Sequence, residues 1–306
     1  MKKMYKLVLI FLVVLLVSGC QSSHIGYDII FTKTEPMSPI ELPDAQQAPI
    51  RVAFSSVLNP ADTIKHYKTL TNYIGEQLNR PVIMIQRKSY SEISMLMING
   101  GADIALLSAG AYITYRNVAG LEAIAMQERK GLPYYQGYLV VNRKSNIKDI
   151  SELKGRSIAF TDPISYSGFI FIDHLLAEFN ETPETFFGRY VYTYNHDSSL
   201  QALLDKVVDA ASVNSLVIKN MEQSDPELAK TLQVIAESPR LGTGPVVVNS
   251  DMPDADKERV KEIFLSMHEQ QDMQKALKGL SIDRYVPVDF KLFDRVDKTN
   301  SNRGSY

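Results

Sequence analysis

Short apolar runs alternate with longer segments of helical periodicity along most of this chain. Runs such as Ile50–Phe54 and Val82–Gln86 are typical of buried strands, because a strand covered on both faces is apolar along its whole length. Between them, Thr63–Leu78 repeats apolar residues at the spacing of one helix face: Ile64, Tyr67, Leu70, Ile74 and Leu78. This alternation predicts an α/β fold with mainly parallel sheets that helices cover on both faces.

The remaining expected elements follow the same alternation. We expect a helix over Ser91–Asn99, a strand over Asp103–Leu107, and a second α/β unit after the apolar run Gly137–Val141. The later expected strands are Ser157–Phe160, Tyr190–Tyr194, Ala210–Val213, Gln233–Ile235 and Pro245–Val248. The expected helices are Ile150–Leu153, Gly168–Phe179, Ser198–Val207, a short one near Leu228–Leu232, and a long one from Asp254 to about Leu277.

This order of elements predicts two α/β lobes. The first comprises residues 49–138 and 247–297, so that C-terminal residues complete it, and the second comprises residues 139–246. The runs Gly137–Val141 and Gly244–Val248 are predicted to be the two hinge strands that cross between the lobes, because glycines flank them. Apolar runs of this length are equally ordinary in a core. Residues 298–306 are expected to form a disordered tail.

The N-terminus has the pattern of an export signal. Lys2, Lys3 and Lys6 precede an uncharged apolar run, Leu7–Val17, which is shorter than the ~20 residues that a membrane-spanning helix needs. The following letters LVSGC resemble the lipobox of bacterial lipoproteins, and lipidation of Cys20 would account for the chain's single cysteine. We therefore expect a signal peptide over residues 1–19 and a lipidated flexible tether over residues 20–48. The alternative is a plain secretory signal with a coincidental cysteine.

Composition narrows the function classes. The chain has 306 residues, 45% of them hydrophobic and 22% charged, with a net charge of −2. This near-neutral charge argues against nucleic-acid binding, because proteins that bind nucleic acids usually carry a basic surface. The histidines lack the spacing of metal ligands, and the sequence contains neither a nucleophile elbow nor a phosphate-binding or dinucleotide motif. We therefore expect no metal, no cofactor and no catalytic residue.

One loop, Thr161–Gly168 (TDPISYSG), carries the strongest candidate chemistry. It lies between an expected strand and an expected helix, and it offers the hydroxyls of Thr161, Ser165, Tyr166 and Ser167. The first amides of a helix lack intrahelical acceptors and carry a partial positive charge, so this loop predicts an anion site that needs no Lys or Arg. The alternative is that one of the serines is simply a helix cap.

Four segments resemble the phosphate-, phosphite- and phosphonate-type periplasmic binding proteins of ABC importers. In chain order they are PADTIKHYKTLTNYIGEQLNRPV, YSEISMLMINGGADIALLSAGAY, ELKGRSIAFTDPISYSGF and NHDSSLQALLDKVVDAASVNS. The resemblance spans roughly residues 50–248 and implies a type II periplasmic-binding-protein fold, in which two lobes clamp a ligand. It also implies that Ser165, Tyr166, Ser167 and the adjacent amides, with Gly168 among them, hold the oxyanion.

The resemblance assigns further ligand contacts. It implies that Tyr90 and Ser108 face the ligand from the first lobe and that His196 lies near the cleft, although a surface histidine is the alternative. Ser55, just after the first strand, is a candidate cleft hydroxyl. Asn214, with Ser215 and Leu216, stands where relatives that take aminoalkylphosphonates have carboxylates, and Gly242–Gly244 likewise lacks one. The expected ligand is therefore phosphate, phosphite or a small apolar phosphonate.

The resemblance implies a monomeric binding protein outside the cytoplasm. Its partners would be an ABC permease and, through the lipid on Cys20, the membrane. Two alternatives remain open from the residues alone. The same clamp could present its closed form to a sensory receptor, since both roles need closure on a ligand. A hydrolase is the alternative of another class.

Overall fold

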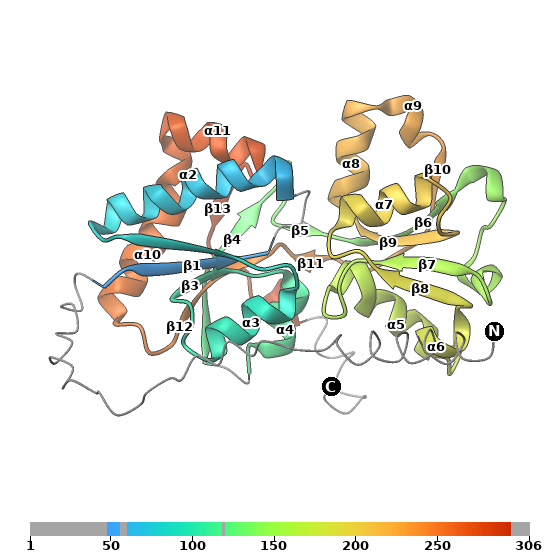
Figure 1. Cartoon of the computed structure of the whole chain (residues 1–306), viewed down its shortest axis with the longest axis horizontal. Coiled ribbons are helices and arrows are strands. Elements are labelled where there is room, and N and C mark those ends of the chain that lie inside the picture. The colour runs from blue at the N-terminus through green and yellow to red at the C-terminus, as the bar shows by residue number, and fades with distance from the viewer. Residues whose placement is uncertain (1–47, 56–59, 118–119, 295–306) are drawn as a thin grey trace, which may run out of the picture. The chain divides into compact units, whose positions relative to one another are not determined.

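The structure is a computed structural model of the whole chain, and it describes residues 48–55, 60–117 and 120–294 (Figure 1). These residues form a six-stranded sheet, a five-stranded sheet and a small sheet of two strands. The expected signal peptide, the tether from Cys20 and the expected tail over 298–306 lie outside the described residues, apart from Ala48.

The first sheet has the strand order β13-β4-β12-β3-β1-β2. Its strands are β1 (Ile50–Phe54), β2 (Val82–Gln86), β3 (Ile104–Leu106), β4 (Leu121–Glu128), β12 (Pro245–Asn249) and β13 (Arg284–Val286). β12 inserts between β3 and β4, so a strand from the C-terminal part of the chain completes the first sheet. β1 is parallel to β2 and β3, whereas β12 is antiparallel to both of its neighbours.

Side chains alternate between the two faces of this sheet. Val52 and Phe54 pack under one set of helices, while Ala53 between them packs under another. The first set is α2 (Pro60–Leu78), α10 (Asp254–Ser266) and α11 (Gln271–Gly279), and the second is α3 (Tyr90–Ile98) and α4 (Ala109–Tyr115) (Figure 1). Each large apolar side chain buried in this way contributes about 1.5–3 kcal/mol.

The second sheet repeats this arrangement with the strand order β10-β6-β9-β7-β8. Its strands are β6 (Gly137–Asn142), β7 (Ser157–Phe160), β8 (Arg189–Tyr192), β9 (Ala210–Asn214) and β10 (Leu232–Glu237). One face packs against α5 (Phe171–Ala177) and α6 (Pro183–Phe186), and the other against α7 (His196–Leu204) and α8 (Ser215–Ser224). The short helix α9 (Pro226–Ala229) follows α8.

The expectation of mainly parallel sheets was wrong. β7 is parallel to β8 and β9, but β6 is antiparallel to β9 and β10 is antiparallel to β6. In both sheets the parallel strands are joined through helices, whereas β6 and β12 directly follow the segments that pass between the lobes. A strand that enters a sheet from the other lobe does not arrive through a crossover helix, so nothing forces it to be parallel.

The expected hinge strands were also wrong. Gly137–Val141 is in β6 and Gly244–Val248 is mostly in β12, and each of these is an inner strand of one sheet, so the expected boundaries 138/139 and 246/247 fall inside strands. The chain passes between the lobes in residues 129–136 and 238–244, which pair through β5 (Tyr134–Tyr135) and β11 (Leu241–Gly242). Gly244 serves close packing, because an added Cβ would lie 2.4 Å from the Leu107 carbonyl oxygen.

Several helices differ from those that the hydrophobic periodicity predicted. Residues Tyr166–Ile170 form a π-helical turn before α5, and Ile150–Leu153 is a 3₁₀ turn. The long C-terminal helix is divided, because Met267–Glu269 is a 3₁₀ turn and Gln270 is extended. Six residues on a straight helix would point Met267 and Met273 about 120° apart, so the break lets both enter the same core. The short helix expected near Leu228–Leu232 instead ends at Ala229, and Leu232 begins β10.

Candidate ligand-binding site

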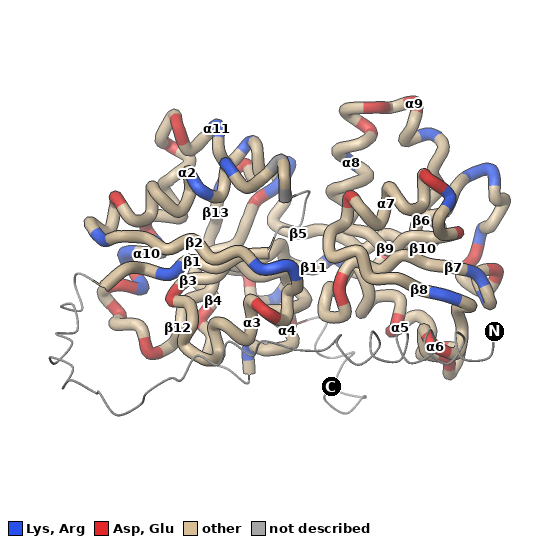
Figure 2. Tube along the Cα trace, in the orientation of Figure 1, with Lys and Arg blue, Asp and Glu red and all other residues tan. Residues whose placement is uncertain are grey.

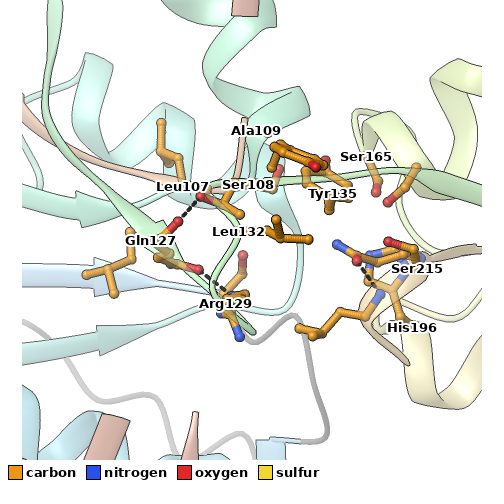
Figure 3. A pocket seen from close by; sticks show the side chains of 18 of the residues that line it. Leu107, Ser108, Ala109, Gln127, Arg129, Leu132, Tyr135, Ser165, His196 and Ser215 are labelled. Atoms are coloured by element: carbon orange, nitrogen blue, oxygen red, sulfur yellow. Dashed lines mark hydrogen bonds between the residues drawn. The ribbon is translucent and has the colours of Figure 1, made fainter. Parts of the chain in front are cut away.

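A cavity lies where the carboxyl ends of parallel strands from both sheets meet (Figure 3). This edge of an α/β sheet is where ligands commonly bind, since the loops that follow adjacent strands converge there. The residues that line the cavity are Ser55, Tyr67, Tyr90, Leu106, Leu107, Ser108, Ala109, Gln127, Arg129, Lys130, Leu132, Tyr134, Tyr135, Ser165, Ser167, His196, Asn214, Ser215, Leu216, Lys219, Thr243 and Gly244.

The first sheet contributes two hydroxyls from adjacent strands. Ser55 follows β1 directly, and Ser108 lies two residues after β3, which pairs with β1 in parallel. The Ser108 hydroxyl caps α4, where its oxygen accepts the Ala111 amide at 3.1 Å. Because a hydroxyl that accepts through its oxygen still has its own proton, Ser108 can donate to a ligand while it caps the helix.

The second sheet contributes groups from three adjacent strands. Ser165 and Ser167 lie in the loop after β7, His196 follows β8, and Asn214 ends β9. The Ser165 oxygen accepts the Gly168 amide at 3.1 Å, so the expected helix cap is present and its proton remains for another acceptor. The cap and the ligand contact are therefore compatible.

His196 is held as a neutral hydrogen-bond donor. Its Nδ1 accepts the backbone amide of Asn214 at 3.1 Å and lies 2.9 Å from the Thr161 hydroxyl. A ring nitrogen that accepts an N–H bond carries no proton, so the proton of the neutral ring is on Nε2. Burial lowers the pKa of His196 to about 3, and only 2% of the residue is exposed. Nε2–H is thus a donor at neutral pH.

Tyr90 places a buried hydroxyl at the cavity without a protein partner. The residue is 1% exposed, and its hydroxyl oxygen has no hydrogen bond to any part of the chain that the structure describes. An unpaired buried polar group costs about 1–3 kcal/mol, a cost that a ligand oxygen would remove. Burial raises the pKa of Tyr90 well above its usual range, so the hydroxyl keeps its proton and can donate.

The cavity lining also contains cationic side chains, which the expected site did not include. Arg129, Lys130 and Lys219 line the cavity, and its described lining contains no Asp or Glu. Arg129 lies across the cavity from Ser165 and His196, and its guanidinium donates to the Gln127 side chain at 2.9 Å (Figure 3). Figure 2 shows acidic and basic residues interspersed over both lobes, so the cationic lining is a local feature.

Most of the residues expected at the site line the cavity. Those that do are Ser55, Tyr90, Ser108, Ser165, Ser167, His196 and Asn214. Thr161, Tyr166 and Gly168 are not among the described lining residues. Thr161 instead contacts the Nδ1 of His196, and an added Cβ at Gly168 would lie 2.5 Å from the Thr161 Cβ. Tyr166 packs its ring among apolar residues of the first lobe, and its hydroxyl bonds the Ser238 side chain.

Sequence reasoning missed several lining residues. Arg129 and Lys130 follow β4, a strand that the periodicity did not predict, and Tyr135 lies in the two-residue strand β5. Helical spacing could have predicted Lys219, since it lies four residues after Ser215 and therefore on the same face of α8. The Ser167 side chain hydrogen-bonds the Tyr135 hydroxyl, a contact between segments too distant for local patterns to predict.

Two other kinds of site are absent from the described residues. No group of three or more His, Cys, Asp or Glu side chains in this part of the chain is arranged to hold a metal ion. Within the same residues, none of the helices combines the length and the apolar character needed to span a bilayer.

Comparisons with known proteins agree on one family. The family model described as "ABC transporter, phosphonate, periplasmic substrate-binding protein" matches residues 52–293. The phosphonates-binding periplasmic protein of Escherichia coli is 26% identical over 212 residues, which are 62% of this chain and 62% of that protein. The phosphate-import protein PhnD of Mycolicibacterium smegmatis is 27% identical over 178 residues, which are 53% and 54% of the two chains. The matches thus span less than two thirds of either relative.

A solved structure supports the fold. The binding protein component of an ABC phosphonate transporter from Pseudomonas aeruginosa superposes with a TM-score of 0.74 at 22% identity, over 83% of this chain and 86% of that one. This likeness confirms the expected type II periplasmic-binding-protein fold with two lobes. Because the family model covers nearly all described residues, the chain belongs to the periplasmic substrate-binding proteins of ABC phosphonate transporters.

Proposed function

We propose that this protein binds a small phosphorus oxyanion, namely phosphate, phosphite or a small phosphonate, outside the cytoplasm. It delivers the anion to the permease of an ABC importer, works as a monomer, and is held at the membrane by a lipid on Cys20. The family supports the transport role, and the names of the two curated relatives support phosphonates and phosphate as the ligand class.

One observation carries the ligand assignment: proton donors converge on a cavity that has no acid in its described lining. Ser165, Ser167 and the Nε2–H of His196 come from the second lobe, and the unpartnered Tyr90 hydroxyl comes from the first. A hydrogen bond to a charged acceptor contributes about 1.5–3 kcal/mol, so four such bonds suffice for micromolar binding, which is about 8 kcal/mol, after the cost of association.

The contacts between the lobes suggest how capture leads to delivery. The Tyr90 amide donates to the Asp162 carboxylate at 2.9 Å, which ties α3 of the first lobe to the loop after β7 of the second. An added Cβ at Gly110 would lie 2.2 Å from the Ile164 carbonyl oxygen, so α4 packs tightly against the same loop. Since both lobes line the cavity, a ligand that bonds to both favours this closed arrangement, and the permease recognises it.

Titration calorimetry with methylphosphonate and phosphate tests the proposal. We expect the purified chain to bind at least one of them at micromolar or lower concentration. Ser167→Ala should weaken binding about tenfold or more, because it removes a donor to a charged acceptor. Ser198→Ala is the matched control, since Ser198 is exposed on α7 and outside the cavity lining. Absence of heat with every phosphorus oxyanion, or equal affinities of the two variants, would overturn the proposal.

A further inference from the structure

The charge of the cavity lining goes beyond what one oxyanion needs. The hydroxyls and His196 can satisfy a single phosphonate head, yet Arg129, Lys130 and Lys219 also line the cavity. None of these three cations forms an ion pair with a described carboxylate. Unpaired cations that converge at one place repel each other, and a bound anion relieves that repulsion.

The two lysines reach the cavity from different elements. Lys130 belongs to the segment that passes between the lobes, and its Nζ donates to the Gln223 side chain at 3.1 Å. Ser215, Lys219 and Gln223 are spaced four residues apart on α8, so they form one face of that helix. Each step of four residues advances about 6 Å along the axis. This face therefore extends along α8 from Ser215, which lines the cavity, and carries positive charge at Lys219.

Electrostatics around Lys130 agree with this geometry. Burial and the charge of Lys219 both lower the pKa of Lys130, whereas the charges of Glu222 and Asp283 raise it by smaller amounts. Asp283 is itself engaged by the Gly131 amide at 2.7 Å and is not among the lining residues. Arg129 is a fixed cation beside Lys130, because its guanidinium also donates to the Leu280 carbonyl at 2.6 Å. Glu222 and Asp283 thus offset only part of the effects that disfavour the charged form of Lys130.

We infer that Lys130 and Lys219 form a second subsite, which binds an anionic group attached to the phosphonate or phosphoryl head by a short linker. The ligand class is then a phosphonate or phosphate ester bearing a carboxylate or a second phosphoryl group, rather than an apolar or amine-bearing phosphonate. An ammonium would meet cations here, and an apolar tail would leave their charges without a partner. This inference rests on the proposed function, since the first subsite holds the head.

Three probes with the same head separate the two subsites. We expect 3-phosphonopropanoate, with its anionic tail, to bind at least about tenfold more tightly than the neutral propylphosphonate, and 3-aminopropylphosphonate to bind most weakly. The preference should weaken as salt rises, because screening acts on the tail interaction. Methylphosphonate serves as the probe of the first subsite alone.

Variants assign the effect to the lysines. Lys219→Gln should reduce the advantage of 3-phosphonopropanoate over propylphosphonate at least fivefold, because only the anionic tail of the first probe pairs with this cation. Lys148→Gln, an exposed site of the same lobe outside the cavity lining, should leave the advantage unchanged. If methylphosphonate binds but the anionic tail gives no advantage, the second subsite is refuted and the proposed function stands. If no probe binds, the proposed function itself fails.

Discussion

At the scale of single residues, His196 has a proton position that its neighbours determine. The Asn214 amide occupies Nδ1, and burial keeps the ring neutral, so the other ring nitrogen carries an N–H rather than a lone pair. A charged imidazolium would need Nδ1 to donate towards an amide that also donates. The same arrangement therefore supplies the donor and makes protonation of the folded protein unfavourable.

This predicts a specific pH dependence of stability. An ordinary histidine has a pKa of about 6.5, whereas His196 titrates near 3 when folded, so between these values the unfolded chain binds the extra proton. Stability should fall as pH falls below about 6.5, by up to about 1.4 kcal/mol per pH unit. Between pH 7.5 and 5, denaturant titration should show wild type losing about 2 kcal/mol more than His196→Gln.

Asp162 changes stability with pH in the opposite direction to His196, and it is present in both wild type and His196→Gln. Burial raises its pKa, so the folded state holds the proton more tightly and stability rises as pH falls through the raised value. The comparison with His196→Gln removes this contribution. Parallel pH profiles of wild type and variant would contradict the neutral, buried histidine.

Which site residues could be predicted depends on where their neighbours lie in the chain. Ser55, Ser165 and Ser167 are close in sequence to the ends of strands that apolar runs mark clearly, so their place at the sheet edge follows from the strands themselves. Lys130 and Lys219 converge only because a segment between the lobes passes beside α8. That proximity is tertiary, and no local pattern in the sequence encodes it.

At the scale of elements, the close approach of α4 to the loop after β7 controls whether the lobes can meet. An added Cβ at Gly110 would lie 2.2 Å from the Ile164 carbonyl oxygen and 2.5 Å from the Tyr166 amide nitrogen. Both are backbone atoms, so no side-chain rotation relieves the overlap. Larger residues at this position must push the lobes apart.

Gly110→Ala should therefore reduce ligand affinity about tenfold or more, which is about 1.4 kcal/mol, with the ligand-free melting temperature nearly unchanged. Gly155→Ala is the contrasting control: its φ of +75° strains an alanine, but nothing lies within 4 Å of the added Cβ. That variant should lower stability and keep affinity. Calorimetry and thermal denaturation separate the two effects, and an unaltered affinity in Gly110→Ala would show that this contact is irrelevant to binding.

Strands were easier to predict than helix limits or strand directions. Apolar runs mark β1 and β7 because these strands are covered by helices on both sides, whereas β2 has an apolar run although it is an edge strand with Ile83 exposed. Tertiary packing, rather than a helix-breaking residue, explains the π turn at Tyr166–Ile170 and the break at Gln270. Neither segment contains a proline, and the break contains no glycine. Direction depends on whether a strand arrives through a crossover helix or from the other lobe.

At the scale of the whole molecule, two lobes of similar construction share one cavity. The periodicity predicted two α/β units, but the clamp came from the family resemblance, because the pairs that join the lobes, β5 and β11, are two residues long. Strands so short leave almost no trace in an apolar pattern. The lobes are thus visible in the sequence, and the connection between them is not.

A crystal structure of the protein with methylphosphonate tests the central claim most directly. We predict that the anion lies in the cavity between the lobes, with its oxygens within hydrogen-bond distance of Ser165 or Ser167, of the His196 Nε2 and of the Tyr90 hydroxyl. A ligand bound elsewhere, with these donors still facing one another or the protein, would contradict it.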